Sequence, residues 1–236
     1  ISISISSISG NFRYIDGVLT SENISIYSEG YTGDIKVNSL HSSKNYDISI
    51  KMYLDELTTP PTLRNFRFNS LSGNIEIKLQ QDSNVSLFSA HMNLDNGSLF
   101  EEDFNALESN IIIIIDNGVY SVKSTGLLTG WNYEPYIWDS IHFHIDHLDN
   151  DLSYYRLNAT SVTGDSLKIH GERNENGEFI ITDLNGILKQ TAIALTKPFY
   201  INNRDEKIDF PHVNLKFSDG EIKLSGNYSN KDHYEI

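Results

Sequence analysis

The chain has 236 residues, a hydrophobic content of 39% and a formal net charge of −14 at pH 7. This acidic balance disfavours binding to nucleic acid, because phosphates are repelled, and adsorption to anionic lipid headgroups. The negative charge does not argue against contact with lipid tails, because the tails are uncharged. The chain contains no cysteine, which excludes disulfides, thiolate metal sites and cysteine nucleophiles.

The sequence contains no run of about 18 apolar residues, so we expect no segment to cross a bilayer as a helix. Ile1, Ile3 and Ile5 already alternate with polar residues, and 233–236 resembles a strand that is just beginning. We therefore expect 1–236 to be one fragment of a longer repeating protein, with any anchor outside it. The sequence shows no clear internal domain boundary.

A short tag recurs along the chain. It reads ISGNF at 8–12, LSGNI at 71–75 and LSGNY at 224–228. A strand pattern that returns in this way indicates an iterated β architecture rather than an enzyme built around one pocket.

Between the tags, apolar and polar residues alternate. Successive side chains of a strand point to opposite faces, so the alternation predicts strands with one apolar and one polar face. Clear cases are Ile24/Ile26, Ile35/Val37, Ile48/Ile50/Met52, Ile75/Ile77/Leu79, Val85/Leu87, Ile141/Phe143/Ile145, Leu167/Ile169, Phe179/Ile181 and Val213/Leu215/Phe217. The chain is predicted to be all-β, with one or two short helices at most.

Two segments in the first half interrupt the strands. Thr58-Thr59-Pro60-Pro61 predicts a loop. Residues 101–107 could form two helical turns, because Glu101, Glu102 and Asp103 would lie near the positive N-terminal end of a helix. Trp131 to Tyr136 is a further irregular stretch.

The run Ile111 to Ile115 breaks the alternation. We expect a strand covered on both faces, and the alternative is a strand whose second face meets a partner or another chain. Asn117-Gly118 then predicts a two-residue hairpin turn, in which Ile115 lies opposite Tyr120 and Ile113 opposite Val122.

Other dipeptides predict turns as well. Asp219-Gly220 suits a hairpin in which Phe217 lies opposite Ile222, Leu215 opposite Leu224, and Lys216 opposite Lys223. Further candidates are Asp16-Gly17, Asn96-Gly97, Asn176-Gly177 and Asn185-Gly186.

The segment 142–147 is the one motif with a catalytic pattern, H-x-H-x-D-H. It resembles the zinc-binding motif of metallo-β-lactamase-like hydrolases, in which His142, His144, Asp146 and His147 would be metal ligands. In that family the motif leads into a helix, whereas 148–157 leads here towards another strand, and the usual glycine is missing. Strand alternation alone places His142, His144 and Asp146 on one outward face. We therefore predict no metal site, no cofactor and no enzymatic activity.

The closing third of the chain carries a family resemblance. The segments that carry it are SLKIHG at 166–171, FIITDLNG at 179–186, LTKPFYI at 195–201 and VNLKFSDGEIKLSG at 213–226. This pattern of alternating strands and glycines resembles that of the translocation-and-assembly-module (TamB) proteins and their AsmA-like relatives. The tags at 8–12 and 71–75 fit the same pattern. The chain differs from better-known members in being poor in Ala and rich in Ile, Asn and Lys.

The resemblance implies an elongated, curled, mostly antiparallel sheet that forms an open trough. It implies a protein of the periplasm and cell envelope of a diderm bacterium, anchored to the inner membrane by a segment outside this chain. The expected partners are phospholipid acyl chains, carried between membranes, and an outer-membrane β-barrel in assembly. The expected lipid-facing groove is lined by Ile48, Ile50, Met52, Ile75, Ile77, Leu79, Phe179, Ile181, Val213, Leu215, Phe217, Ile222 and Leu224.

Two rival functions remain open at this point. A metal-dependent hydrolase would bind zinc and lose it on the substitution His144→Ala. A secreted adhesin or structural β domain would seal its apolar face in a sandwich. Alternation is required by both an open trough and a sealed sandwich, so the sequence cannot separate them.

Overall fold

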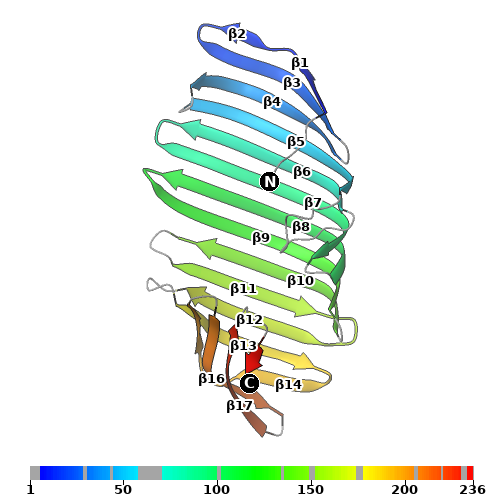
Figure 1. Ribbon diagram of the computed structural model, residues 1–236, viewed down its shortest axis with the longest axis vertical. Helices are drawn as coiled ribbons and strands as arrows, with labels where there is room; N and C mark the ends of the chain where they lie inside the picture. The colour runs from blue at the N-terminus through cyan, green and yellow to red at the C-terminus, as the bar shows by residue number, and fades with distance from the viewer. Residues whose placement is uncertain are drawn as a thin grey trace. The chain divides into compact units, whose positions relative to one another are not determined.

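The computed structural model describes residues 6–28, 31–42, 45–57, 71–99, 102–133, 136–148, 152–173, 178–204, 207–218, 220–229 and 233–235 (Figure 1). Throughout these ranges the regular structure is antiparallel β-strand, which confirms the predicted all-β class. The chain forms two compact units, Ile1–Ile137 and Trp138–Ile236, called unit 1 and unit 2 below.

Unit 1 contains mostly long strands. Their bounds are β1 Ser7–Gly10, β2 Arg13–Ile15, β3 Val18–Ser28, β4 Tyr31–Ser42, β5 Asn45–Leu57, β6 Leu71–Asp82, β7 Val85–Leu99, β8 Glu102–Asp116 and β9 Val119–Tyr133.

The sheet of unit 1 is a meander. From β3 to β8 each strand pairs with the strand before it and the strand after it, while β1 and β2 share the outer edge of β3. Figure 1 shows these strands side by side in one twisted layer. Among the described residues of unit 1 there is no helix and no second sheet.

The turns explain the register of unit 1. Asn117 and Gly118 have φ angles of 50° and 83°, the left-handed pair that a two-residue hairpin with matching twist requires. Ile115 therefore lies opposite Tyr120, and Ile113 opposite Val122, as predicted. The predicted turn at Asp16-Gly17 is confirmed in the same way between β2 and β3.

Unit 2 contains mostly shorter strands. Their bounds are β10 Tyr136–His147, β11 Ser153–Thr160, β12 Ser166–Arg173, β13 Phe179–Leu188, β14 Thr191–Leu195, β15 Phe199–Arg204, β16 Lys207–Phe217, β17 Gly220–Ser229 and β18 His233–Glu235. The first residues of β10 belong to unit 1 by the division given above.

The pairing in unit 2 branches. Strands β10 to β13 form a meander, but β13 then pairs with β14 over one half and with β15 over the other. Both β14 and β15 pair in turn with β16, which is followed by β17 and β18. Two short strands thus take the place of one long strand.

The predicted register of the β16–β17 hairpin is wrong by two residues. Leu215 lies opposite Ile222, and Phe217 lies opposite Gly220, because the connection begins one residue earlier than Asp219-Gly220. The apolar faces still coincide, since a shift of two keeps each side chain on its face. Lys216 lies opposite Glu221, so the predicted Lys–Lys opposition is replaced by opposite charges.

Three local predictions are also wrong. The proposed helix at 101–107 is strand from Glu102 onwards, because Glu102, Asp103 and Phe104 pair with β7, and the strand pairs with both β7 and β9 from Ala106. Asn96-Gly97 and Asn185-Gly186 lie inside β7 and β13. The predicted loop at 58–61 and turn at 176–177 lie outside the described residues, and of 131–136 the structure assigns 131–133 to β9 and Tyr136 to β10.

The recurring tag owes its glycine to close approach between strands. Gly73 has φ 138°, and a Cβ atom at this position would collide with the carbonyl oxygen of Asn93 on β7. A Cβ at Gly10 would lie 2.8 Å from the carbonyl oxygen of Asn23. Only glycine allows the backbones to come this near.

Candidate functional site

The apolar face of unit 1 is built by the pairing of its central strands. Ile48 lies opposite Leu79, Ile50 opposite Ile77 and Met52 opposite Ile75, so the six groove residues expected in this unit lie together. The same face continues onto the strands on either side through Ile24, Ile35, Val37, Phe88, Ala90, Met92, Ile111, Ile113 and Val122.

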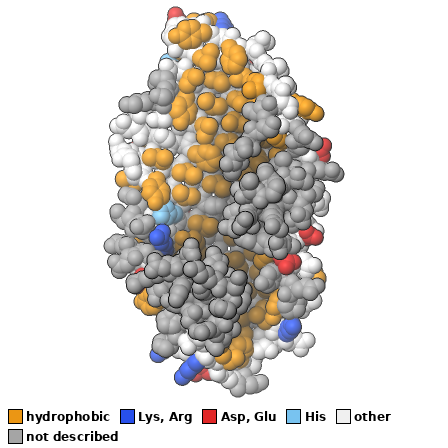
Figure 2. Space-filling model, in the orientation of Figure 1, with side chains coloured by type: hydrophobic (Ala, Val, Ile, Leu, Met, Phe, Trp, Pro, Cys, Tyr) orange, Lys and Arg blue, Asp and Glu red, His pale blue; other side chains and the backbone are white. Residues whose placement is uncertain are grey.

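This face is half-buried rather than sealed. Ile24, Val37 and Ala90 are buried, whereas Ile50 and Ile77 are only partly covered. Figure 2 shows hydrophobic side chains gathered over the strands of unit 1 on the side turned to the viewer. A sandwich would need a second sheet against this face, and the described part of unit 1 contains a single sheet.

Serines interrupt the apolar face at several positions, among them Ser86 and Ser124, and two others donate to backbone carbonyls. Ser109 Oγ donates to the Thr125 carbonyl oxygen at 3.2 Å, and Ser21 Oγ donates to that of Asn11 at 2.6 Å. A hydroxyl whose proton is used in this way adds little polarity to the surface. The face therefore remains apolar across these positions.

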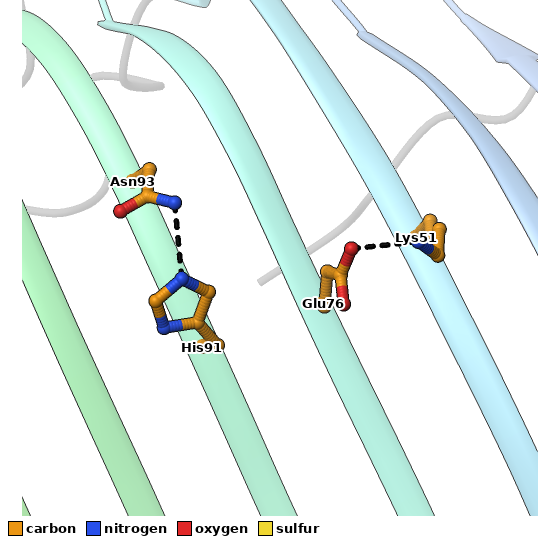
Figure 3. Close-up of polar contacts among 4 residues, drawn as sticks. All are labelled: Lys51, Glu76, His91 and Asn93. Atoms are coloured by element: carbon orange, nitrogen blue, oxygen red, sulfur yellow. Dashed lines mark hydrogen bonds and ion pairs between the residues drawn. The ribbon is translucent and has the colours of Figure 1, made fainter.

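The opposite face of unit 1 is polar and internally bonded (Figure 3). Lys51 Nζ lies 2.7 Å from Glu76 Oε1. Asn93 Nδ2 donates to His91 Nε2 at 3.0 Å, and His91 Nδ1 donates to Asn110 Oδ1 at 2.8 Å. The amide groups fix these directions, because an amide nitrogen can only donate and an amide oxygen can only accept.

Charge pairing shifts the protonation of the Lys51–Glu76 pair. The hydrogen bond to Glu76 and its charge raise the pKa of Lys51 above its ordinary value of 10.5. The hydrogen bond from Lys51 and its charge lower the pKa of Glu76 below 4.5. Both groups are solvent-exposed, so the pair stays ionised without adding much to stability.

In unit 2 the expected groove residues also share one face. Tyr155 and Ile181 both lie opposite Gly171, and the rings of Tyr155 and Phe179 are 4.8 Å apart. A register shift between His170 and Gly171 on β12 means that β13 returns an apolar side chain to this face at Leu184, opposite Ile169.

Further along unit 2, Leu215 lies between Leu195 and Ile222, while Phe217 lies opposite Ile193. Val213 is buried opposite Leu224, but Leu224 and Ile222 are exposed. The apolar face of unit 2 is thus more open at β17 than at β16.

A shallow depression of about 460 Å³ lies beside this region. It is lined by Lys197, Pro198, Asn214, Lys223, Leu224 and Ser225. The lining offers two ammonium groups, and its one hydroxyl has no carboxylate or imidazole among these residues to act as a base. This composition does not build a nucleophilic catalytic site.

The H-x-H-x-D-H segment is split between two faces of β10. His142 and His144 lie opposite Asn158 and Arg156 on the polar face, where His144 Nε2 lies 2.8 Å from Asp146 Oδ2. His147 has the opposite parity and hydrogen-bonds to the buried Ser153.

The structure therefore does not bring the four candidate ligands together. Within the described ranges, no group of three or more His, Asp or Glu side chains is arranged to hold a metal ion. Elsewhere in unit 2, His170 lies on β12 with its Nδ1 3.8 Å from Asp183 Oδ2.

Comparison of the chain with models of protein families, with curated proteins and with solved structures finds no match in any of the three. The described residues include no helix of a length and hydrophobicity that could cross a membrane. The site must therefore be interpreted from its own geometry.

Sequence reasoning missed the breadth of the apolar face. Phe88, Ile111 and Ile113 belong to it together with the expected residues of β5 and β6. The alternation predicted for this segment, Val85/Leu87, lies on the opposite face of β7, because Phe88 and not Leu87 is paired with Leu79; this register depends on the short turn after Asp82. That turn, Ser83-Asn84, contains no glycine, although Ser83 adopts φ 51°.

Proposed function

We propose that the chain is a segment of an inter-membrane lipid-transport protein whose apolar sheet face shields phospholipid acyl chains. The observation that carries this proposal is the broad apolar face of unit 1, which continues across the strands from β3 to β8 on a single sheet whose other face is mostly polar. A protein surface of this kind needs an apolar partner, because large exposed apolar areas are otherwise unfavourable in water.

The dimensions of the face suit a lipid tail. One row of the sheet runs through Ile24, Ile35, Ile50, Ile77, Ala90 and Ile111 on six neighbouring strands. At about 4.8 Å between strands this row extends over roughly 24 Å. Half the hydrocarbon thickness of a bilayer, the length available to one acyl chain, is about 15 Å.

The energetics favour tails over headgroups as the bound part. Each CH₂ group that leaves water for an apolar surface contributes about 0.8 kcal/mol. The formal charge of −14 opposes adsorption to anionic headgroups but does not act on uncharged tails. Envelope localisation, an anchor outside the chain and an outer-membrane barrel partner extend the proposal through the family resemblance of the sequence.

The test compares two neighbouring residues on opposite faces. A photo-crosslinking amino acid placed at Ile50 faces the apolar side, and one placed at Ser49 faces the polar side of the same strand. We expect lipid to be captured from living cells at position 50 and not at position 49. Equal capture at both positions, or capture at neither, would reject the proposal and favour a sealed β domain.

A further inference from the structure

The run Ile111 to Ile115 is not covered on both faces, contrary to the expectation from sequence. Ile112 and Ile114 are on the polar face of β8 and are 41% and 40% exposed. Their neighbours on the apolar face, Ile111 and Ile113, have the opposite parity. The polar face therefore carries apolar side chains that the lipid-binding role does not use.

These isoleucines belong to a cluster at the hairpin ends of three strands. Ile114 lies opposite Leu87 on β7, and on the same face Asp116 lies opposite both Val85 and Val119. Val85 and Val119 are 42% and 48% exposed. We call this set the aliphatic patch, and its members are Val85, Leu87, Ile112, Ile114 and Val119.

Charged side chains flank the aliphatic patch with opposite signs. One row across the sheet holds Lys78 and Lys123, on either side of Ser89 and Ile112. The row at the hairpin ends holds Asp82 and Asp116. The patch thus has a basic border towards the strand centres and an acidic border towards the turns.

We propose that the aliphatic patch is the interface of a symmetric dimer, in which a second copy of this chain packs face to face against it. A two-fold axis along the row Gln80–Leu87–Ile114 exchanges the two borders. Lys78 of one copy then meets Asp82 of the other, while Leu87 and Ile114 pack against themselves.

A second copy is the occupant that the charge pattern selects. A patch with a basic border on one side and an acidic border on the other complements itself under a two-fold rotation, which is the requirement of an isologous interface. An anionic membrane surface would be repelled by Asp82 and Asp116. The interface uses the face opposite to the lipid-binding face, so either proposal can fail without the other.

The first experiment measures self-association by sedimentation equilibrium. We expect the 236-residue chain to show a reversible monomer–dimer equilibrium below about 1 mM, and Ile114→Lys to weaken it about tenfold or more. Thr32→Lys is the matched control, because Thr32 is exposed on the polar face away from the patch, and it should leave the equilibrium unchanged. Circular dichroism confirms that both variants fold.

The second experiment exchanges the charges. Lys78→Glu and Asp82→Lys should each weaken the dimer, and the double variant should recover it, because the exchanged charges again meet across the axis. A chain that stays monomeric up to about 1 mM overturns the proposal. So does a dimer that is insensitive to Ile114→Lys, or a double variant as weak as the sum of the singles.

Discussion

Units 1 and 2 use the same alternation but build sheets of different regularity. In unit 1, the pairings from β6 to β9 proceed without a register shift. In unit 2, β12 and β13 shift register after His170, β16 and β17 shift between Phe210 and Val213, and β13 divides between two partners. Unit 1 also has register shifts, in the pairings of β3 with β4, β4 with β5 and β5 with β6, but they lie outside the row that joins Ile35, Ile50 and Ile77. An unshifted register keeps the rows of a face aligned, so the centre of unit 1 offers a continuous apolar surface.

The comparison also shows how a β-bulge affects the separation of apolar and polar residues between the two faces of a sheet. Each bulge reverses the alternation on one strand, so the sequence of that strand must reverse with it to keep apolar residues on one side. On β13 in unit 2, the apolar residues Ile181 and Leu184 are three residues apart instead of two, so both stay on the apolar face across the bulge. In unit 1 the long strands need no such correction between β6 and β9.

A charge placed in the middle of the apolar face should give the largest difference in stability loss between the two units. Ile50→Asp places a carboxylate between Ile35 and Ile77, and we expect it to destabilise the chain by about 2–4 kcal/mol. Leu215→Asp, beside the exposed Ile222, should cost about half as much. Urea unfolding measures both.

The controls for these substitutions lie on the other face. Ser49→Asp and Lys216→Ser should change stability by no more than about 0.5 kcal/mol. Lipid capture should fall with both Asp variants and stay unchanged in both controls. Equal destabilisation by Ile50→Asp and Ser49→Asp would contradict the assignment of faces.

Glycine replacement should distinguish tight from relaxed strand contacts. Gly73→Ala in unit 1 introduces a collision with the Asn93 carbonyl oxygen at φ 138°, and we expect a loss of about 2–3 kcal/mol. In unit 2, a Cβ at Gly171 would lie 3.2 Å from the Ile180 carbonyl oxygen, so Gly171→Ala should cost about 1 kcal/mol or less. Thermal unfolding of the two variants ranks their losses of stability. A larger loss for Gly171→Ala than for Gly73→Ala would contradict the assignment of the tighter strand contact to Gly73.

The hairpin turns allow a smaller and cleaner test. Gly118 has φ 83° with open space around a new Cβ, so Gly118→Ala should cost about 1 kcal/mol through backbone strain alone. Gln190 in unit 2 already adopts φ 66°. We therefore expect Gln190→Gly to change stability in the opposite direction, by about 0.5 kcal/mol. Denaturant midpoints that move in the same direction for both variants would show that the turn conformation is not the cause.

The smallest effect is expected from the Lys51–Glu76 pair. The lowered pKa of Glu76 gives stability that is present above pH 4.5 and is lost as the pH falls through the folded-state pKa. The raised pKa of Lys51 gives stability that is present below pH 10.5 and is lost as the pH rises through its folded-state value. Lys51→Met should remove a slight pH dependence in the acid range, and salt should do the same in the unsubstituted chain. Unfolding measured from pH 3 to 7 detects it, and an unchanged profile in Lys51→Met would assign that dependence to other groups.

Side-chain parity was predictable from the sequence because it depends only on neighbours two residues apart. The groove residues of β5 and β6 illustrate this, since their alternation placed them on one face before any pairing was known. The turn at Asn117-Gly118 was predictable because its residues favour positive φ.

Features that depend on long-range pairing could not be predicted. Residues 101–107 carry acids that would suit a helix start, but Glu102 and Asp103 are held extended by their pairing with β7. The β13–β14 turn is Lys189-Gln190, with φ angles of 47° and 66°, and neither residue signals a left-handed conformation.

The meander of unit 1 has a consequence for how the chain folds and changes length. From β3 to β9 each strand pairs with the one made immediately before it, so every new strand closes only a local loop against an existing edge. Such a sheet can grow in the order of synthesis. Removing two consecutive strands leaves the next strand running in the same direction with the same face inward, so a sheet of this kind can be shortened or extended in hairpin steps while its two faces keep their character.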